Sequence, residues 1–480
     1  MINSLEEIFS PTGCAVVGAS RNPTKAGYQI LKNMITAGYQ GEIFPVNPAG
    51  DPILDLPSCG SIHEIDGTVE LVVLSAPAAA TPSIVEDLEA RMAAQKDIRW
   101  IICSAAGYSE IGSVEGITYQ NSLVEFCRKH GIRLIGPNCV GIIDTKNHLD
   151  TTFIADISHV PGGISFVSQS GAIGAWLLMS WTASPAGGVG FRRFVTVGNM
   201  ADVDIIESME MLGKDSETRV LGMYLEGAAE ALRLVIGMCD IVRKKPVVVL
   251  KVGRSDEGAR AAQSHTGSLA GTDSIYEGAF RQFGITRVNS IKELSDTIRA
   301  FDTLPLPLGD RTFILTQAGG PGIFCVDEMA AKGNLVPAVV EEATKKKLAA
   351  AVPPIASICH PEGHADITAA ALANHHADAL EIVLRDPGVD AVIFITVATL
   401  FLDLEEMARR IVDALSRLRA DGIDKPVFPV ILSGNWVLPA RMRLEENGIP
   451  TYDGPDAAVC VLSHMVGYRQ FLQEHTHEDS

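Results

Sequence analysis

The residue of this 480-residue chain best suited to covalent chemistry is a histidine in a loop of small residues. His265 lies in Ser264-His265-Thr266-Gly267-Ser268, where small neighbours leave an imidazole ring open to approach. One ring nitrogen becomes a better nucleophile when a carboxylate binds the other and fixes the tautomer. Glu226 follows an expected buried strand and can supply that carboxylate. The pair indicates a histidine that carries a phosphoryl group, provided that other residues bind the phosphate.

Two expected strand-to-helix turns could bind that phosphate. One is Gln169-Ser170-Gly171-Ala172-Ile173-Gly174 and the other is Gln317-Ala318-Gly319-Gly320-Pro321-Gly322. The free N–H groups and the dipole at a helix N-terminus stabilise an anion. We therefore predict that both turns point at one phosphate on His265, which favours a phosphoryl carrier over a structural histidine.

A third turn, Gly18-Ala19-Ser20, predicts a further phosphate site between a strand and a helix. Arg21 and Lys25 lie nearby and could add positive charge. NAD is disfavoured because the Gly-x-Gly-x-x-Gly spacing is absent, and because the second strand ends at Asn47, where a ribose-binding Asp or Glu would be expected. On these residues alone, a tight turn in an ordinary α/β domain stays open as the alternative.

His360, His364 and Asp366 could suggest a metal site, since His and carboxylate are common ligands. The intervening Pro361 and Gly363 disfavour a regular presentation, and no Cys-x-x-Cys pair exists, so we predict no metal site. The later His375-His376 pair is expected on a solvated helix.

Three regions of alternating strands and helices must position these residues. Apolar runs that end in turn-forming residues predict βαβ units with a parallel sheet, whose ligands bind beyond the carboxyl ends of the strands. The alternating prolines of 304–309 predict a linker before the third region. The expected strands are 14–17, 42–46, 71–75, 100–103, 133–135, 165–167, 219–224, 246–251, 312–316, 392–397 and 427–432, with helices over 27–37 and 271–280.

The composition limits the classes of partner and the location that we expect for the protein. Lys and Arg total 39 against 58 Asp and Glu, so 39 − 58 gives a net charge of −19, which disfavours nucleic acid and anionic membranes as partners. No apolar run is long enough to span a bilayer. The nine scattered cysteines and the absence of a signal peptide predict a cytoplasmic protein. At about 150 residues per domain, the length predicts about three domains.

In their order and spacing, these segments resemble the α subunit of ADP-forming (NDP-forming) acyl-CoA synthetases, such as acetate–CoA ligase, which are related to succinyl-CoA synthetase. The segments that carry the resemblance are Val17-Gly18-Ala19-Ser20 through Gly27, Pro45-Val46-Asn47-Pro48, Gly136-Pro137-Asn138-Cys139, Ser168-Gln169-Ser170-Gly171, Gly198-Asn199-Met200-Ala201-Asp202-Val203-Asp204, Tyr224-Leu225-Glu226-Gly227, Ser264-His265-Thr266-Gly267 and Gln317-Ala318-Gly319-Gly320-Pro321-Gly322.

The resemblance implies an α/β fold with a Rossmann-like CoA-binding domain over 1–150, a succinyl-CoA-synthetase-like domain with the phosphohistidine over 151–304, and a flavodoxin-like ligase domain over 308–480. It implies that His265 is phosphorylated and that Glu226 orients it. The expected phosphate-binding residues are Ser170, Gly171, Gly267, Gly319 and Gly320. The expected CoA-binding residues are Gly18, Ala19, Ser20, Lys25, Asn47, Pro48, Pro77 and Asn138.

The family reaction interconverts acyl-CoA, ADP and phosphate with a carboxylic acid, CoA and ATP. The three regions use up the chain, and neither an ATP-grasp segment nor a Walker motif is found. We therefore expect a β subunit with an ATP-grasp fold, in a heteromer for which α2β2 is one arrangement, to bring ATP or ADP with Mg²⁺. A CoA-binding regulatory protein of the same fold without turnover is the alternative. A fused acetyltransferase is not expected, because the three regions leave no segment of the size that it would need.

The chain departs from the family pattern at two places. Ala49 stands where the family commonly has a lysine, which removes one contact to a CoA phosphate. The 360–366 segment stands where the family has an Asn-Pro-hydrophobic-Asp stretch, and we expect it to influence acyl selectivity or a subunit interface.

Overall fold

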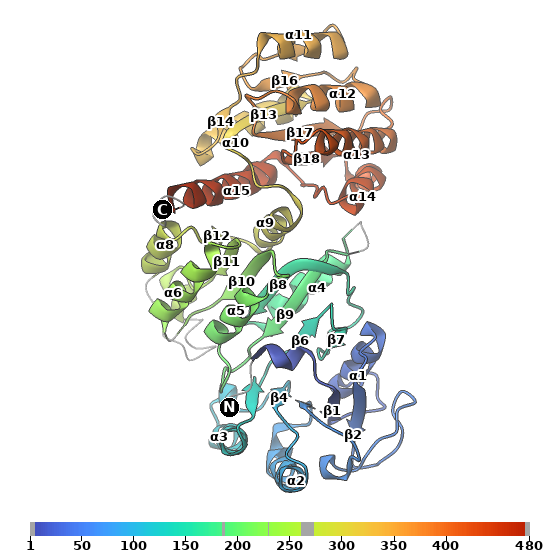
Figure 1. Cartoon of the computed structure of the whole chain (residues 1–480), viewed down its shortest axis with the longest axis vertical. Coiled ribbons are helices and arrows are strands. Elements are labelled where there is room, and N and C mark those ends of the chain that lie inside the picture. Colours follow the sequence, from blue (N-terminus) through green and yellow to red (C-terminus); the bar gives the residue numbers. More distant parts are fainter. Residues whose placement is uncertain (1–4, 185–187, 229, 261–272, 476–480) are drawn as a thin grey trace. The chain divides into compact units, whose positions relative to one another are not determined.

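A computed structural model of the chain describes residues 5–184, 188–228, 230–260 and 273–475. The chain divides into two compact units (Figure 1). The first comprises Met1–Ala183 and Gly188–Gln282, and the second comprises Ser184–Gly187 and Phe283–Ser480.

The first sheet of the first unit is fully parallel, with the order β2-β1-β3-β4-β5. Its strands are β1 (Gly13–Val17), β2 (Glu42–Val46), β3 (Leu71–Leu74), β4 (Trp100–Cys103) and β5 (Arg133–Ile135). These are the five strands expected from the apolar runs. Residues on β1, β3 and β4 are all buried, because helices cover both faces of a parallel sheet.

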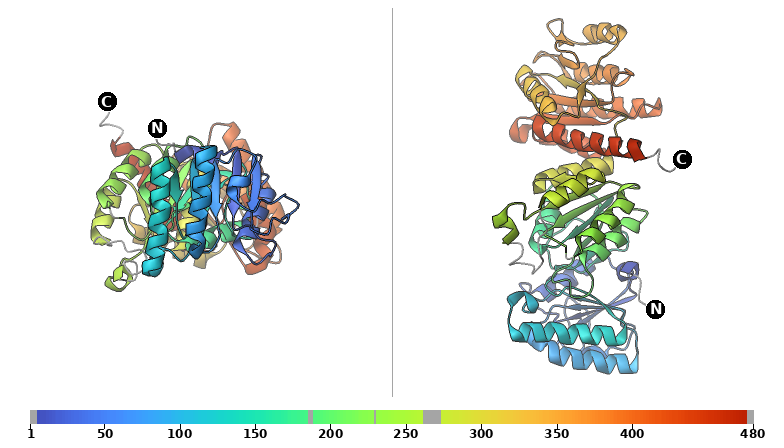
Figure 2. Two further views of the ribbon diagram at one scale, coloured as in Figure 1. Left: turned by 90° about the horizontal axis from the view of Figure 1, so that it is seen from below. Right: turned by 90° about the vertical axis from the view of Figure 1, so that its left-hand side faces the viewer.

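Three helices follow these strands: α1 (Ala26–Ala37), α2 (Thr81–Ala94) and α3 (Val114–His130). α2 and α3 lie side by side (Figure 2) and share a hydrophobic core with β3 and β4. α1 and α3 each end at a glycine, Gly38 and Gly131, in the left-handed conformation that closes a helix. The serine Ser113 caps the start of α3 through a hydrogen bond from the N–H of Gly116.

The second sheet runs β11-β10-β8-β9-β6-β7 across the first unit. Its strands are β6 (Ile142–Asp144), β7 (Leu149–Asp150), β8 (Pro161–Ser168), β9 (Phe191–Thr196), β10 (Val220–Leu225) and β11 (Val247–Lys251). β8 to β11 are parallel where they pair, whereas β6 and β7 form an antiparallel edge. Its helices are α4 (Gly171–Thr182), α5 (Ile205–Lys214), α6 (Ala231–Val242) and α8 (Asp273–Gln282).

The second unit holds a six-stranded sheet, β15-β16-β13-β17-β18, with β14 paired to β13. The strands of this unit are β12 (Thr286–Val288), β13 (Arg311–Thr316), β14 (Val336–Pro337), β15 (Ser357–Ile358), β16 (His364–Asp366), β17 (Ala391–Val397) and β18 (Val427–Leu432). Its helices are α9 (Ile291–Thr303), α10 (Gly319–Lys332), α11 (Glu342–Ala351), α12 (Ala373–Leu384), α13 (Leu404–Ala420), α14 (Leu438–Glu446) and α15 (Pro455–His475).

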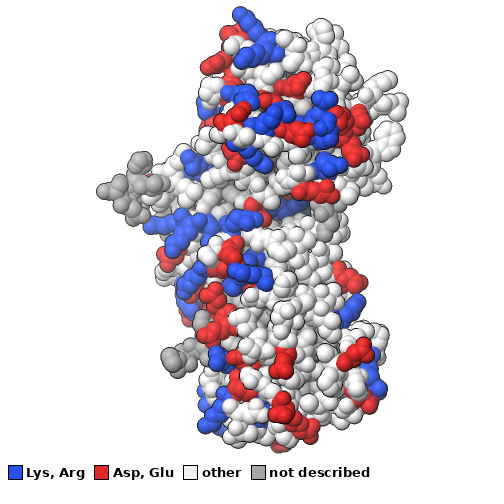
Figure 3. Space-filling view, turned by 45° about the vertical axis from the view of Figure 1, so that its right-hand side comes forward, with Lys and Arg blue, Asp and Glu red and all other residues white. Residues whose placement is uncertain are grey.

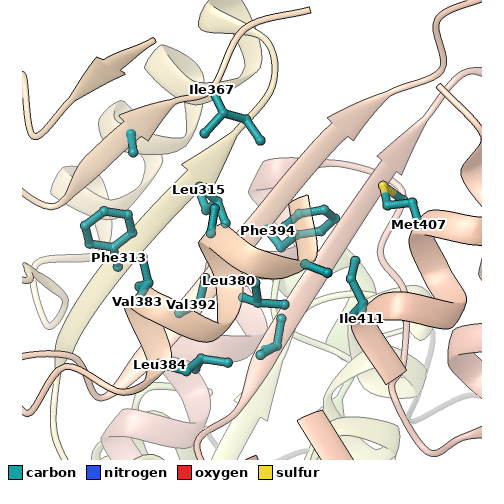
Figure 4. Close-up of a cluster of buried hydrophobic side chains, with 14 of the residues drawn as sticks. Phe313, Leu315, Ile367, Leu380, Val383, Leu384, Val392, Phe394, Met407 and Ile411 are labelled. Carbon is teal, nitrogen blue, oxygen red and sulfur yellow. The ribbon is translucent and has the colours of Figure 1, made fainter. Parts of the chain in front are cut away.

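The side chains of β13 and β17 alternate between two cores. Phe313 and Leu315 pack with Leu380 of α12 and Met407 of α13 (Figure 4), whereas Ile314 packs with residues of α10 and α15. This alternation follows from the period of two along a strand. The sheet is therefore covered on both faces, as a flavodoxin-like fold requires.

The expected helix around His375-His376 is present as α12, but its predicted exposure was wrong for one residue. His376 is fully buried, and its Nδ1 donates to the carbonyl oxygen of Leu372 at 2.8 Å. Burial lowers the pKa of His376 to about 4.

Acidic and basic side chains lie next to one another over the face drawn in Figure 3. None of the helices in the described ranges has the length and apolarity needed to cross a bilayer.

Candidate functional site

The glycine turn after β1 is held by close backbone contacts. Gly18 has a φ of +89°, and a Cβ at this position would lie 2.5 Å from the backbone nitrogen of Ala76. The hydroxyl of Ser75 donates to the carbonyl oxygen of Gly18 at 3.3 Å. A glycine is required here for both the dihedral angle and the space.

Asn47 fixes the same turn from the neighbouring strand β2. Its Nδ2 donates to the carbonyl oxygen of Ala19 at 2.6 Å, and its Oδ1 accepts from the N–H of Ala49 at 2.9 Å. The structure thus brings Gly18, Ala19 and Asn47 together at the carboxyl ends of adjacent parallel strands, which is where such sheets bind ligands.

The other predicted CoA-binding residues lie around this edge. Ser20 accepts a hydrogen bond from the N–H of Asn22 at 3.1 Å. Lys25 is exposed and directly precedes α1; Pro48 is exposed after β2, and Pro77 is exposed after β3. These side chains leave the turn open to a ligand from solvent.

Asn138, after β5, reaches an open cleft of about 1000 Å³ within the first unit. The cleft is also lined by Ser170 and Gly171 at the start of α4 and by Asn199 after β9. Asn138 has a φ of +59°, and its Nδ2 donates to Oδ1 of Asn199 at 3.3 Å. The structure therefore brings one predicted CoA-binding residue and two predicted phosphate-binding residues to the same cleft.

The turn from β8 into α4 is a polar helix start. The hydroxyl of Ser168 donates to the carbonyl oxygen of Ser170 at 2.7 Å, and the Ser170 hydroxyl accepts from the N–H of Ile173 at 3.3 Å. A Cβ on Gly171 would lie 2.6 Å from Cγ2 of Val140. The backbone N–H groups of this turn and the helix dipole favour an anion.

Glu226 is buried and connected to this turn by its backbone. Oε1 of Gln169 accepts from the N–H groups of Glu226, at 2.5 Å, and of Gly227, at 3.2 Å, and Nε2 of Gln169 donates to the carbonyl oxygen of Gly227 at 2.7 Å. Burial and the Glu226 carboxylate raise the pKa of Tyr224 to about 12. The backbone at Glu226 and Gly227 is therefore held next to the α4 turn.

Lys251, at the end of β11, lies next to Glu226 and was not singled out from the sequence. It is fully buried, and its Nζ donates to the carbonyl oxygen of Glu226 at 2.9 Å and to that of Val252. The same ammonium lies 5.0 Å from the ring centroid of Tyr276. Lys251 therefore holds the loop after β10 in place through its hydrogen bond to the Glu226 carbonyl oxygen.

The turn from β13 into α10 in the second unit is built in the same way. The Thr316 hydroxyl donates to the carbonyl oxygen of Ala318 at 2.8 Å, and Gln317 accepts from the N–H of Val397 at 3.3 Å and from the hydroxyl of Thr396. Gly319 and Gly320 form the first turn of α10, and the space around the Cβ position of Gly320 is open. This second helix start can also receive an anion.

The segment 360–366 lies against the start of α10. His364 is buried on β16, neither ring nitrogen has a hydrogen bond, and burial lowers its pKa. A Cβ on Gly319 would lie 3.2 Å from Oδ2 of Asp366. The segment that departs from the family pattern thus supports a predicted phosphate-binding helix.

His265 and Gly267 lie outside the described residues. Glu110 and Asn199 line the cleft and were not predicted. Burial alone would raise the pKa of Glu110, but hydrogen bonds from Asn199, at 2.6 Å, and from the N–H of Gly107 hold it below its usual value. The position of Asn199 in Gly198-Asn199-Met200 was visible in the sequence, whereas nothing there distinguished Glu110 from other surface acids.

Proteins of known name match the sequence of this chain over nearly its whole length. The α subunit of acetate–CoA ligase [ADP-forming] II from Pyrococcus furiosus is 37% identical over 96% of this chain and 97% of its own length. The chain belongs to the α-subunit family of ADP-forming acetate–CoA ligases. The single-chain acetate–CoA ligase [ADP-forming] of Methanocaldococcus jannaschii is 32% identical over 97% of this chain and 63% of that protein.

Family models and a solved structure agree with this membership. The models match a CoA binding domain at 13–145, a succinyl-CoA ligase-like flavodoxin domain at 161–301 and a ligase-CoA domain at 312–469. The dinucleotide-forming acetyl-coenzyme A synthetase 1 of Ca. Korarchaeum cryptofilum, solved with phosphate and ADP, is 31% identical, with a TM-score of 0.87 over 99% of both chains. The predicted fold class and family are confirmed.

Proposed function

We propose that this α subunit binds CoA at the first sheet, carries a phosphoryl group on His265, and works in an ADP-forming acid–CoA ligase. In one direction its substrates would be acyl-CoA, inorganic phosphate and ADP, and in the other a small carboxylic acid, CoA and ATP. The relatives reported above are named for acetate, and acetate is the first acid to test.

The observation that carries this proposal is the cleft of the first unit. Asn138 from the CoA-binding sheet and the Ser170-Gly171 helix start line the same volume, and Gln169 joins that helix start to Glu226. A thioester and a phosphate can therefore meet within one cleft, whose residue Gln169 binds the backbone of the buried Glu226. A protein that only bound CoA would not need the Ser170-Gly171 helix start as a phosphate site.

The reaction divides into three balanced transfers. Phosphate attacks the thioester carbon, the C–S bond breaks, and CoA leaves as an acyl phosphate forms. A nitrogen of His265 then attacks the phosphorus, and the carboxylate of the acid leaves. ADP finally takes the phosphoryl group and becomes ATP. Glu226 would hold the imidazole in the correct tautomer, and the N–H groups at Ser170, Gly171, Gly267, Gly319 and Gly320 would stabilise the phosphoryl oxygens.

A partner with an ATP-grasp fold would supply the nucleotide step. The subunit name of the Pyrococcus relative supports a heteromer, and the Methanocaldococcus enzyme extends beyond the region that this chain matches. We place ATP or ADP and Mg²⁺ on that partner, with α2β2 as one arrangement.

We further propose three domains, over 1–150, 151–304 and 308–480. The three sheets and the three matching family models support this division. A cytoplasmic location is supported by the nine cysteines, all of which lie in the described ranges and are free.

Replacement of one carboxyl oxygen tests the proposed role of Glu226. With the ATP-grasp partner present, Glu226→Gln should lower ATP formation from acyl-CoA, ADP and phosphate by about 10²- to 10⁴-fold, because the imidazole loses its orienting charge. CoA affinity measured by calorimetry should not change. The exposed neighbour Glu230, changed to Gln, is the matched control and should keep full activity.

Equal rates for Glu226→Gln and wild type would contradict the role of this carboxylate. CoA binding by wild type without turnover on any acid of a short-chain and aryl panel would support a regulatory protein of the same fold.

A further inference from the structure

Three metal-ligating side chains meet between two helices of the second unit. Glu293 lies in the first turn of α9, and Cys460 and His464 lie on α15, which packs against α9 (Figure 1). The two α15 residues are four positions apart and therefore share one face of that helix. Among the described residues, this is the one group of three or more such side chains close enough to share an ion.

The three donor atoms form a small triangle. Oε1 of Glu293 lies 2.9 Å from Nε2 of His464 and 3.3 Å from Sγ of Cys460, and Sγ lies 3.6 Å from Nε2. A thiolate, an imidazole nitrogen and a carboxylate oxygen are the ligand types that zinc prefers. All three donors belong to side chains that are partly buried, so the helices restrict their positions.

The triangle has the size of one face of a tetrahedral zinc site. An ion about 2.0 Å from the nitrogen and oxygen and about 2.3 Å from the sulfur would meet these donors at angles of about 93°, 100° and 114°. These angles lie close to tetrahedral and sum to well under a full circle. The ion would therefore sit off the plane of the donors, with a fourth position free.

Neighbouring groups hold two of the three ligands in place. Oε2 of Glu293 accepts from the N–H of Asn289 at 2.8 Å, which fixes the carboxylate while Oε1 points to His464. Nζ of Lys332 donates to Sγ of Cys460 at 3.2 Å, which holds the sulfur in place beside Glu293. A cavity of about 520 Å³ reaches two of the three ligands, Glu293 and Cys460, from solvent. It is also lined by Asp453 and Asp456 and by Lys292 and Lys332.

We propose that Glu293, Cys460 and His464 form a zinc site with three protein ligands, whose fourth position is open to this cavity. Bound zinc would join α9 to α15 and replace the hydrogen bonds that now connect the three side chains. The inference is independent of the function proposed above.

Metal binding to the full chain tests this site. Wild type, stripped with a chelator, should bind one zinc ion per chain by equilibrium dialysis. The cobalt form should show a thiolate-to-cobalt charge-transfer band. Cys460→Ser and His464→Gln should each weaken zinc binding at least about tenfold, and Cys460→Ser should remove the band. The matched control Cys239→Ser, which changes a half-buried cysteine on α6, should keep both.

The proposal fails if wild type takes up no stoichiometric zinc. It also fails if Cys460→Ser and His464→Gln retain the wild-type affinity, since the metal would then lie elsewhere. Circular dichroism confirms that each variant is folded. Glu293→Gln provides a third ligand change, with the same expected loss, where either of the others unfolds.

Discussion

Gly18 combines two requirements that can be separated by experiment. Its φ of +89° disfavours any side chain, and its Cβ position is blocked by the backbone of Ala76. Gly38 has a similar φ of +82° but open space around its Cβ position. Gly18→Ala should therefore lose more unfolding free energy than Gly38→Ala, which should lose about 1 kcal/mol from its dihedral angle alone.

Urea unfolding of both variants measures this difference, and calorimetry adds a functional readout. Gly18→Ala should also weaken CoA binding, because the turn must shift, whereas Gly38→Ala should bind CoA normally. Equal stability and equal CoA affinity for the two variants would contradict the role given to the Gly18 turn.

His376 predicts a pH dependence of stability. Burial lowers its pKa to about 4, whereas the unfolded chain has the ordinary value near 6.5. Between these values the unfolded state binds more protons, so stability falls as the pH falls. From pH 7 to pH 4.5 this histidine should cost about 2 to 3 kcal/mol.

Urea unfolding at both pH values, on wild type and on His376→Gln, checks the sign and the size. The variant should be less stable at pH 7 but should lose less on acidification than wild type. The exposed His360, changed to Gln, is the control in the same unit and should follow wild type. An unchanged pH dependence in His376→Gln would show that the buried ring does not titrate in this range.

At the residue scale, the sequence predicted positions better than roles. Asn47 was chosen for the end of its strand, and it lies there, but its side chain ties down the Ala19 carbonyl. Lys251 looked like the last residue of an apolar strand, since nothing local shows that its ammonium is buried under Glu226. Such contacts come from tertiary packing of strands that are distant in sequence, which a local pattern does not encode.

The start of α10 offers a matched pair of glycines at the element scale. A Cβ on Gly322 would lie 2.6 Å from Nε2 of the buried His364, whereas Gly320 has open space. Alanine normally stabilises a helix relative to glycine by about 1 kcal/mol. Gly320→Ala should therefore be neutral or more stable, and Gly322→Ala should lose about 1 to 3 kcal/mol through overpacking.

Thermal or urea unfolding of the two variants decides between these effects. A stabilised Gly322→Ala would mean that His364 moves aside freely, and the support that it gives to α10 would be refuted. Gly320→Ala should still reduce turnover with the partner present, because Gly320 is a proposed phosphate-binding residue.

The sequence did not predict strand β9, and there is a physical reason for this. β9 carries Arg192 and Arg193, which interrupt an apolar run. Both are buried because Asp144 pairs with them, at 2.5 Å through Nη1 of Arg192 and at 2.9 Å through Nε of Arg193. Other long parallel strands, such as β10, β13 and β17, were predicted because each is largely an apolar run that ends at turn residues.

At the scale of the molecule, a chain of net charge −19 is proposed to bind phosphate and CoA, which are anions. The helix starts after β8 and β13 resolve this conflict locally, since N–H groups and dipoles act within one turn. Within the first unit, Arg133 of β5 binds Glu207 of α5 at 2.7 Å and Asp202 at 2.9 Å, so that the two sheets around the cleft are tied together. The first unit can therefore present CoA and phosphate in one place.

At the scale of the whole molecule, some features could not be predicted from the sequence. The proposal of three domains in this order followed from the length, the apolar runs and the family resemblance. The proposed zinc ligands did not, because Cys460 and Glu293 are 167 residues apart, and only the helical spacing of Cys460 and His464 was visible. The prediction of no metal site rested on the 360–366 segment and on the missing Cys-x-x-Cys spacing, and neither bears on Glu293, Cys460 and His464.

Phosphorylation of His265 tests the central claim most directly. The chain would be incubated with its ATP-grasp partner, Mg²⁺ and ATP labelled in the γ-phosphate, and protein-bound label that is stable to base and labile to acid would be counted. Wild type and the control variant His148→Asn, which changes an exposed histidine, should each take up label, and His265→Asn should take up none. Equal labelling of wild type and His265→Asn would contradict the account.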